Sequence, residues 1–222
     1  MSDVRVIEVK QSIFANNNKR ADKLRAELKK DKTYFLNLMS SPGSGKTTTL
    51  LKTIDFLKGK LKIGIMEADI DGDVDAQVIK DSGIKSIQLH TCGMCHLDSE
   101  MTRQGLDELG TKDIDLAILE NVGNLVCPAE FDTGSHLNVV ILSICEGDDK
   151  PLKYPLMFET CDVLLINKID VEPYFDFDMK KVTDFALMRN NNIKIFPISA
   201  KTGQGIDKWC DFLLYKVNEF LN

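Results

Sequence analysis

The segment between residues 34 and 57 restricts the fold of this chain more than any other part of its sequence. An apolar run at 34–39 leads into the sequence SSPGSGKT, and a helical pattern follows over 46–57. Gly43 and Gly45 allow backbone N–H groups to come close to an anion, and the start of the helix adds a partial positive charge. A strand, a loop of this composition and a helix in this order are typical of a phosphate-binding loop.

The residues after the first glycine of this loop carry its chemistry. Lys46 would reach the β- and γ-phosphates of a nucleotide, and the Thr47 hydroxyl would bind Mg²⁺. Ser44 and Thr48 would add contacts to the phosphates around the start of the helix. Ser40 stands where such loops usually begin with glycine. A glycine-containing turn without a ligand is the alternative interpretation.

Apolar runs of strand length alternate with helical patterns along the rest of the chain. Such alternation favours a parallel sheet covered on both faces. We therefore expect a three-layer α/β/α P-loop NTPase fold with a mostly parallel sheet, in a single domain over 1–222 with an N-terminal helical segment at about 9–30. The further strand runs are 63–66, 86–89, 114–119, 139–144, 163–166 and 193–198, and the further helical patterns are 74–81, 97–109, 175–189 and 206–221.

Composition excludes several classes of protein. The chain has 222 residues, of which 43% are hydrophobic and 28% charged, as in ordinary globular proteins. No apolar run approaches the length of about 20 residues that a membrane-spanning helix needs, and no secretory signal is visible. The net charge of −6 argues against nucleic-acid binding. The six cysteines are too sparse for a disulfide scaffold, so we expect a cytoplasmic protein with free thiols.

A second loop, NKID at 167–170, predicts which base is bound. Asp170 carries an acceptor-only carboxylate, and guanine offers it two donors, N1–H and the exocyclic amine. Adenine would leave the carboxylate unpaired, at a cost of about 1–3 kcal/mol or more. Lys168 can lie along the base, and Asn167 can tie this loop to the phosphate loop. The next strand run is followed by Ser199, Ala200 and Lys201. A backbone N–H in this segment could meet the guanine carbonyl.

The NKID match alone is weak, but its place downstream of the phosphate loop makes it specific. Together the two loops predict binding of GTP and GDP, with an unliganded polar turn as the alternative for NKID.

Acidic residues at two other strand ends are candidates for metal binding and catalysis. Glu120 ends a strand run and could hold Mg²⁺ through water, and the Gly123 N–H could sense the γ-phosphate. Asp69 ends another run and is a second candidate Mg²⁺ ligand. Asn124 stands where small signalling GTPases carry a water-orienting glutamine, so we expect slow intrinsic hydrolysis. Three acids beyond Asp69 are either part of this cluster or a solvated helix start: Asp71, Asp73 and Asp75.

The sequence CGMCHLD at 92–98 predicts a transition-metal site. Cys95 and His96 follow a strand run, and Cys127 follows the run that ends at Glu120. Parallel strands end at the same edge of a sheet, so these residues could approach each other. Thiolate and imidazole favour Zn²⁺, Cu⁺ or Ni²⁺, and Cys92 is a possible additional ligand. The ligands are few for a closed site, which favours an open or dimer-shared one; buried thiols and a satisfied histidine are the alternative.

The remaining cysteines and histidines have less specific patterns. Cys145, Cys161 and Cys210 lie on apolar strand or helix patterns, so we expect them in the core. His90 is expected at a strand end, and His136 near the nucleotide-responsive segment.

These motifs, in the order SSPGSGKT, CHLD, ENVGNLVCPAEFD and NKID, resemble the HypB family over about residues 37–201. HypB proteins are GTPases of the SIMIBI class that help to insert nickel into [NiFe]-hydrogenases. The resemblance implies a nickel metallochaperone that dimerises when GTP is bound and holds Ni²⁺ or Zn²⁺ at Cys95, His96 and Cys127. It also implies that Lys153 can reach the nucleotide of the partner subunit.

The partners implied by the resemblance are a nickel-binding accessory protein and the precursor of a hydrogenase large subunit. Two other functions remain open. One is a regulatory GTP-binding switch whose thiols hold structural zinc, and the other is a nickel GTPase of the urease pathway.

Overall fold

The computed structural model describes residues 9–69, 83–91 and 93–222, and in this part of the chain seven strands form one entirely parallel sheet. The strand order is β3-β2-β4-β1-β5-β6-β7. The strands are β1 (Tyr34–Ser40), β2 (Ile63–Asp69), β3 (Lys85–His90), β4 (Leu116–Glu120), β5 (Leu137–Ser143), β6 (Val163–Asn167) and β7 (Lys194–Pro197). The expected helix at 74–81, the acids Asp71, Asp73 and Asp75, Cys92 and the side chain of Asp69 lie outside the described residues.

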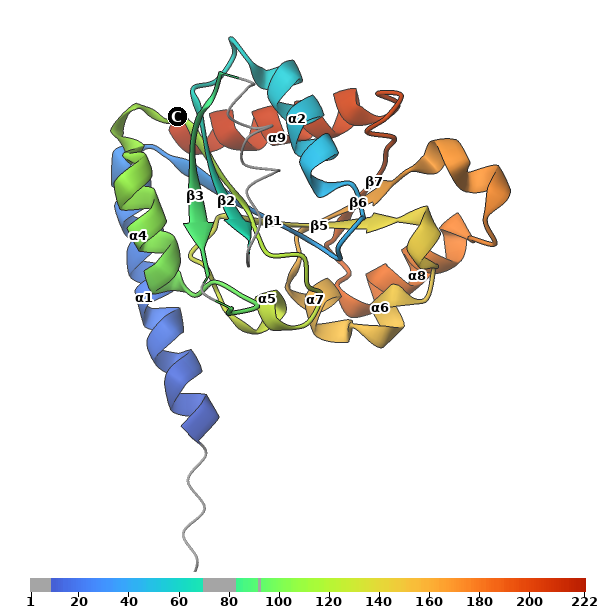
Figure 1. Ribbon diagram of the computed structural model, residues 1–222, viewed down its shortest axis with the longest axis horizontal. Coiled ribbons are helices and arrows are strands. Elements are labelled where there is room, and N and C mark those ends of the chain that lie inside the picture. Colours follow the sequence, from blue (N-terminus) through green and yellow to red (C-terminus); the bar gives the residue numbers. More distant parts are fainter. Residues whose placement is uncertain (1–8, 70–82, 92) are drawn as a thin grey trace, which may run out of the picture.

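Helices cover both faces of the sheet, so the predicted three-layer α/β/α architecture is confirmed (Figure 1). One face packs against α2 (Lys46–Leu57) and α9 (Ile206–Leu221). The other face packs against α1 (Val9–Asp31) and α4 (Ser99–Leu109) on one side. On its other side it packs against α7 (Pro155–Thr160) and α8 (Met179–Arg189). The strands β1, β4, β5 and β6 are almost wholly buried between these layers, which explains their continuous apolar runs, whereas the edge strands β3 and β7 are only partly buried.

Side-chain caps decide where two of the helices begin. Asp98 accepts hydrogen bonds from the Glu100 and Met101 N–H groups, so α4 begins at Ser99 and not at residue 97 as the apolar pattern predicted. Asp178 accepts from the Lys181 N–H in the same way, and α8 begins after it. The short helical segments between the main elements are η1 (Thr111–Asp113), α5 (Cys127–Glu130), η2 (Ile144–Glu146), α6 (Lys150–Lys153) and η3 (Ile169–Tyr174).

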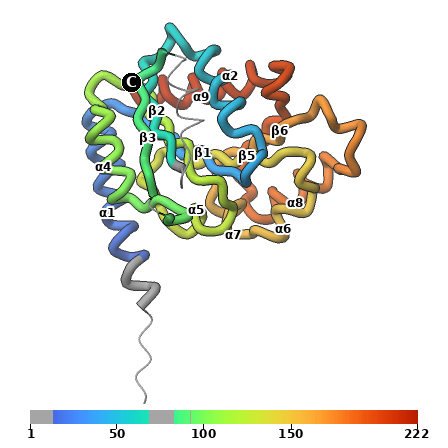
Figure 2. The backbone as a smooth tube through the Cα atoms, in the orientation of Figure 1, coloured from blue at the N-terminus to red at the C-terminus, as the bar shows by residue number. Residues whose placement is uncertain are grey.

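The parallel sheet brings the predicted functional segments to one edge. The loops after β1, β3, β4, β6 and β7 all leave the carboxyl ends of their strands, and these ends meet at one edge of a parallel sheet. Figure 2 shows the loops after β1 and β4 on the same side of the strands. The fold therefore places at this edge both nucleotide loops and the chain around Cys95 and Cys127.

Two predictions for single cysteine and histidine residues are wrong. Cys145 is exposed, because β5 ends at Ser143 and the chain turns into η2, which leaves this side chain outside the core. His136 lies at the amino edge of the sheet, opposite the nucleotide loops, because it directly precedes β5. There its ring stacks on Tyr34, and its Nδ1 accepts a hydrogen bond from the Phe35 N–H.

The predictions for two other cysteines and one other histidine are confirmed. Cys161 and Cys210 are buried, and His90 is the last residue of β3. Over the residues that the structure describes, no helix combines the length and the apolar character needed to cross a membrane.

Candidate nucleotide and metal site

The phosphate loop is shaped by a glycine that touches the second nucleotide loop. Gly45 caps α2 in the left-handed region, with φ 92°. A Cβ atom at this position would lie 2.5 Å from Asn167 Nδ2. Gly43 also has a positive φ, of 74°, but a Cβ there would meet no atom within 4 Å. Any side chain at Gly45 would therefore collide with the base loop, whereas Gly43 faces open space.

Lys46, Thr47 and Glu120 form one polar cluster under this loop. The Thr47 hydroxyl lies 2.7 Å from Glu120 Oε1, and Lys46 Nζ lies 3.4 Å from the same oxygen. Glu120 is 1% exposed, so the lysine balances a buried negative charge. A hydroxyl and a carboxylate are the hard oxygen ligands that Mg²⁺ prefers. The residues present therefore fit a magnesium ion beside the phosphates of a nucleotide.

Gly123 lies directly against the phosphate loop. A Cβ atom built on Gly123 would be 3.3 Å from the backbone nitrogen of Pro42. Such close packing leaves little room for a side chain, so the segment after β4 and the phosphate loop are in contact. A conformational change in one of these two loops would therefore alter the packing of the other.

The base loop is joined to the phosphate loop by two side chains, which confirms the predicted role of Asn167 as a tie. Asn167 Nδ2 donates to the Ser44 carbonyl at 2.9 Å, and Asn167 Oδ1 accepts from the Ala200 N–H at 3.0 Å. Lys168 Nζ donates to the Gly43 carbonyl at 2.7 Å. Lys168 has a φ of 66°, so its backbone adopts the left-handed conformation that turns this loop.

Asp170 is oriented by the SAK segment. Ser199 Oγ donates to Asp170 Oδ1 at 2.6 Å, and Ser199 is fully buried. Ser199 uses one lone pair of Oδ1, so the other lone pair of Oδ1 and the whole of Oδ2 remain as acceptors for a ligand. Lys201 follows in the same segment and is exposed.

The structure brings two of the predicted metal ligands together. The sulfur atoms of Cys95 and Cys127 are 2.8 Å apart. Their mutual hydrogen bond raises the pKa of the Cys95 thiol, because that bond favours the protonated form. A bound cation would reverse this preference by stabilising the thiolate.

His96 does not join the thiol pair as a third ligand in the part of the chain that the structure describes. Its ring stacks on Phe131 with the ring centres 3.8 Å apart. Its Nδ1 is buried and has no hydrogen-bond partner among the described residues. Burial lowers the pKa of His96, which keeps the ring in the neutral form that binds metals. Among the described residues, no three His, Cys, Asp or Glu side chains converge as metal ligands.

Two other predicted residues stand apart from these clusters. Lys153 is 60% exposed and pairs at 2.6 Å with Asp149, the residue that precedes α6. Its hydrogen bond with Asp149 raises its pKa. Asp69 ends β2 beside His90 in the register of the sheet.

Sequence reasoning missed two polar contacts at this site. Ser41 of the phosphate loop donates to the Glu146 carboxylate, whose other oxygen accepts from the Ser143 N–H at 2.8 Å. Asn17 of α1 contacts Ser99 and Asp132, which follow Cys95 and Cys127 in the chain. The helical spacing of Asn17 with the buried residues Ala21 and Leu24 is the signal that could have identified it as a buried polar residue.

The parallel sheet, the phosphate loop and the base loop together define a P-loop nucleotide-binding protein. Residues 35–197 match the family model described as "CobW/HypB/UreG, nucleotide-binding domain". The chain is 43% identical to the hydrogenase maturation factor HypB of Escherichia coli K12 over 213 residues, which are 96% of this chain and 73% of that protein. It is 39% identical to the hydrogenase/urease maturation factor HypB of Helicobacter hepaticus, over 95% of this chain and 88% of that protein.

A crystal structure of HypB from Helicobacter pylori in complex with nickel has a similar fold. The TM-score is 0.87 and the sequence identity is 36%, with 92% of this chain and 96% of that chain covered. The chain belongs to the HypB family.

Proposed function

We propose that this protein is a GTP-hydrolysing nickel metallochaperone that acts in the maturation of [NiFe]-hydrogenase. The observation that carries the proposal is the segment from Glu120 to Cys127. One end of this segment contacts Lys46 and Thr47 in the nucleotide site, and the other end contacts Cys95. The nucleotide state can therefore act on the thiol pair through a few residues of backbone.

The base loop supports GTP and GDP as the nucleotides. Asp170, held by Ser199, would accept from N1–H and the exocyclic amine of guanine. Lys168 spans from the base loop to the phosphate loop, where its methylene groups can lie along the base. Adenine presents an acceptor to the carboxylate and would be rejected.

In hydrolysis, Lys46 would stabilise negative charge on the γ-phosphate, and the Gly123 N–H would donate to it. Thr47 and Glu120 would hold Mg²⁺, with Asp69 as a further candidate ligand; this ion would neutralise charge on the phosphates. Asn124 Oδ1 accepts from the Val126 N–H at 2.8 Å and so is folded onto its own loop. A residue held in this way is poorly placed to orient water, which supports slow intrinsic turnover.

Nickel is the proposed cargo, and Cys95, Cys127 and His96 are its proposed ligands. His96 would have to leave Phe131 to join the thiols, or the site would be completed by a second copy of the chain. We propose that GTP binding promotes this homodimer, in which Lys153 reaches the nucleotide of the partner subunit. The proposed partners are a nickel-binding accessory protein and a hydrogenase large subunit precursor, in the cytoplasm, where thiols stay reduced.

A nickel titration of the protein tests this proposal, once with GDP and once with a non-hydrolysable GTP analogue. Couplings of about 1–3 kcal/mol between sites would change nickel affinity about 5- to 150-fold between the two states. We expect the site to tighten or to appear with the analogue, at one metal per two chains or one per chain of a dimer. Equal affinity and stoichiometry in both states would refute the coupling.

A second candidate is a nickel GTPase that also serves urease, which is favoured by the similarity to the hydrogenase/urease maturation factor HypB of Helicobacter hepaticus. Loss of the gene would then lower both hydrogenase and urease activity in the host. A loss confined to hydrogenase would contradict this second candidate.

A structural zinc site is the remaining alternative for the thiols. Chelation would then lower the unfolding midpoint outright, whereas a delivery site would leave the fold intact.

A further inference from the structure

The sheet alone does not bring Cys95 and Cys127 together. Cys95 follows β3 and Cys127 follows β4, and β2 lies between these two strands. Neighbouring strands are about 4.8 Å apart, so β3 and β4 are separated by about 10 Å. The two sulfur atoms are nevertheless 2.8 Å apart. Contacts outside the sheet must therefore draw together the two thiol segments, which we define as residues 95–99 and 127–135.

Asn17 of α1 provides such a contact, because its side chain bonds to both thiol segments. Its Oδ1 accepts from the Ser99 N–H at 2.9 Å and lies 2.7 Å from Ser99 Oγ. Its Nδ2 donates to the Asp132 carbonyl at 2.9 Å. The Ser99 N–H can only donate and the Asp132 carbonyl can only accept, so both groups fix the orientation of the amide. Asn17 is 5% exposed, which makes these bonds costly to lose.

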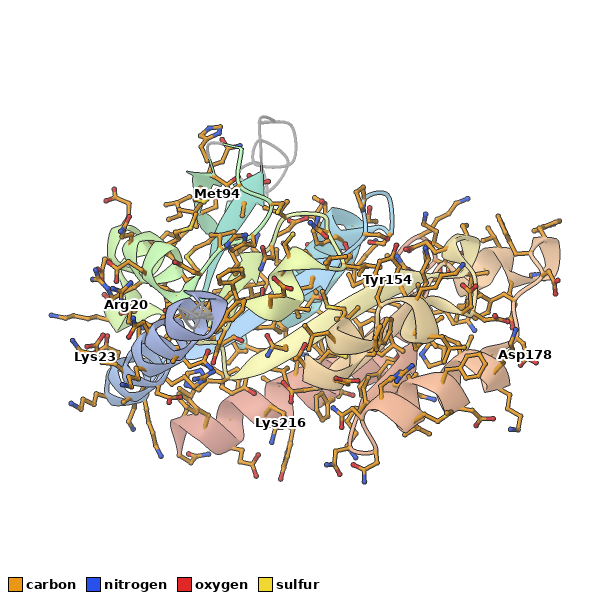
Figure 3. All side chains as sticks on the ribbon, turned by 90° about the horizontal axis from the view of Figure 1, so that it is seen from below. Arg20, Lys23, Met94, Tyr154, Asp178 and Lys216 are labelled. Atoms are coloured by element: carbon orange, nitrogen blue, oxygen red, sulfur yellow. The ribbon has the colours of Figure 1, made fainter. Side chains whose placement is uncertain are left out.

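Other residues of α1 strengthen the same contact. Arg25 pairs with the Asp132 carboxylate, and its Nε donates to the Ser135 carbonyl at 3.0 Å. The ring centres of Phe14 and Phe131 are 5.1 Å apart, and Phe131 is the residue on which His96 stacks. α1 and α4 lie side by side in Figures 1 and 2, and in Figure 3 Arg20 and Lys23 point outward from α1. The face of α1 that carries Asn17 is thus turned toward the thiol segments.

We propose that Asn17 is a positioning residue for the metal-binding thiols. Its carboxamide holds residues 95–99 and 127–135 at a fixed separation, and this sets both the distance between Cys95 and Cys127 and the affinity of the metal that they share. The metal part of this inference rests on the proposed function, whereas the spacing of the thiols does not. Substitution of residues that orient metal ligands without touching the metal commonly lowers metal affinity by about 10- to 100-fold.

Three variants test the role of Asn17. Asn17→Leu keeps the branched shape of the side chain and removes the side-chain bonds to both segments. Ser99→Ala is milder, because it removes the hydroxyl and keeps the N–H bond to Asn17. The matched control is Thr33→Val, in the turn between α1 and β1. Thr33 is buried like Asn17, and its hydroxyl lies 3.0 and 2.9 Å from the Thr111 and Ile114 carbonyls, between which it shares its one proton.

The first measurement needs no metal. Diamide, an azo oxidant, takes up two electrons and two protons as two thiols form a disulfide, and peptide mapping gives the rate for the Cys95–Cys127 pair. We expect Asn17→Leu to slow this rate at least about tenfold, because the thiols lose their proximity. Ser99→Ala should slow it less, and Thr33→Val should stay within about twofold of the unaltered protein. The second measurement is a titration with nickel alone. We expect Asn17→Leu to weaken nickel binding most, Ser99→Ala to weaken it less and Thr33→Val to leave it nearly unchanged.

Each outcome decides one part of the inference. Equal oxidation rates in Asn17→Leu and Thr33→Val would overturn the positioning role, whatever the metal does. An unaltered protein that binds no nickel would overturn the proposed function and leave the oxidation result to judge Asn17. Circular dichroism checks the fold of each variant; if Asn17→Leu is unfolded, then Ser99→Ala alone decides, and an unchanged rate in it refutes the proposal.

Discussion

Replacing Gly45 by alanine should destabilise the protein more than the same change at Gly43, even without nucleotide. Both glycines have positive φ angles, 92° and 74°, so both alanines are strained. Only at Gly45 would the new Cβ lie 2.5 Å from Asn167 Nδ2, whereas at Gly43 it would meet no atom within 4 Å. The pair of variants therefore separates backbone strain from the collision with the base loop.

The structure gives the expected magnitudes. The left-handed conformation costs an alanine roughly 1–2 kcal/mol, and both variants carry this cost. Gly45→Ala must also displace Asn167 from the Ser44 carbonyl, which it contacts at 2.9 Å in a buried position. A buried donor left without a partner costs about 1–3 kcal/mol. We therefore expect the free energy of unfolding to fall by about 1–2 kcal/mol in Gly43→Ala and by about 2–5 kcal/mol in Gly45→Ala.

Urea unfolding of the nucleotide-free protein measures this difference. Trp209 is the only tryptophan, it is 2% exposed, and its Nε1 donates to Thr53 of α2 at 3.0 Å. Its fluorescence therefore reports on the helix that follows the phosphate loop. Equal losses of stability in the two variants would show that the two nucleotide loops are not in contact as described.

Three other predictions follow from the site and the core. Asp170→Asn should weaken GTP binding by roughly 100-fold or more and favour xanthosine triphosphate, whose C2 carbonyl can accept from an amide; competition binding measures this, and unchanged GTP affinity would contradict the base-loop assignment. Burial lowers the pKa of His136 to about 4, so its stabilising effect is complete above its ordinary pKa of 6.5 and is lost as the pH falls toward 4. The free energy of unfolding of the unaltered protein, relative to His136→Gln, should accordingly drop by about 2–3 kcal/mol between pH 7 and pH 4.5, and a constant difference would refute this. Alkylation mapped by mass spectrometry should modify exposed Cys145 rapidly and spare Cys161 and Cys210, whose burial raises both thiol pKa values, that of Cys210 to about 12; rapid modification of Cys210 would contradict its burial.

Local patterns in the sequence were sufficient to predict most elements of the fold. The expected helices at 46–57 and 206–221 have the same bounds in α2 and α9, because their apolar faces repeat at helical spacing and pack on the sheet. Helix starts were less accurate where a side-chain cap, such as Asp98, decides the first turn. The strand order could not be read, because an apolar run indicates that a strand is buried and not which strands lie beside it.

The sequence by itself determined the chemistry of the nucleotide loops, because their residue types and spacing act locally at strand ends. Only the tertiary structure decided which side chains meet. It placed Cys95 against Cys127 and His96 against Phe131, and it buried Asn17 between the two thiol segments. These contacts join residues far apart in the chain, and they depend on how α1 and the loops pack, which no local pattern encodes.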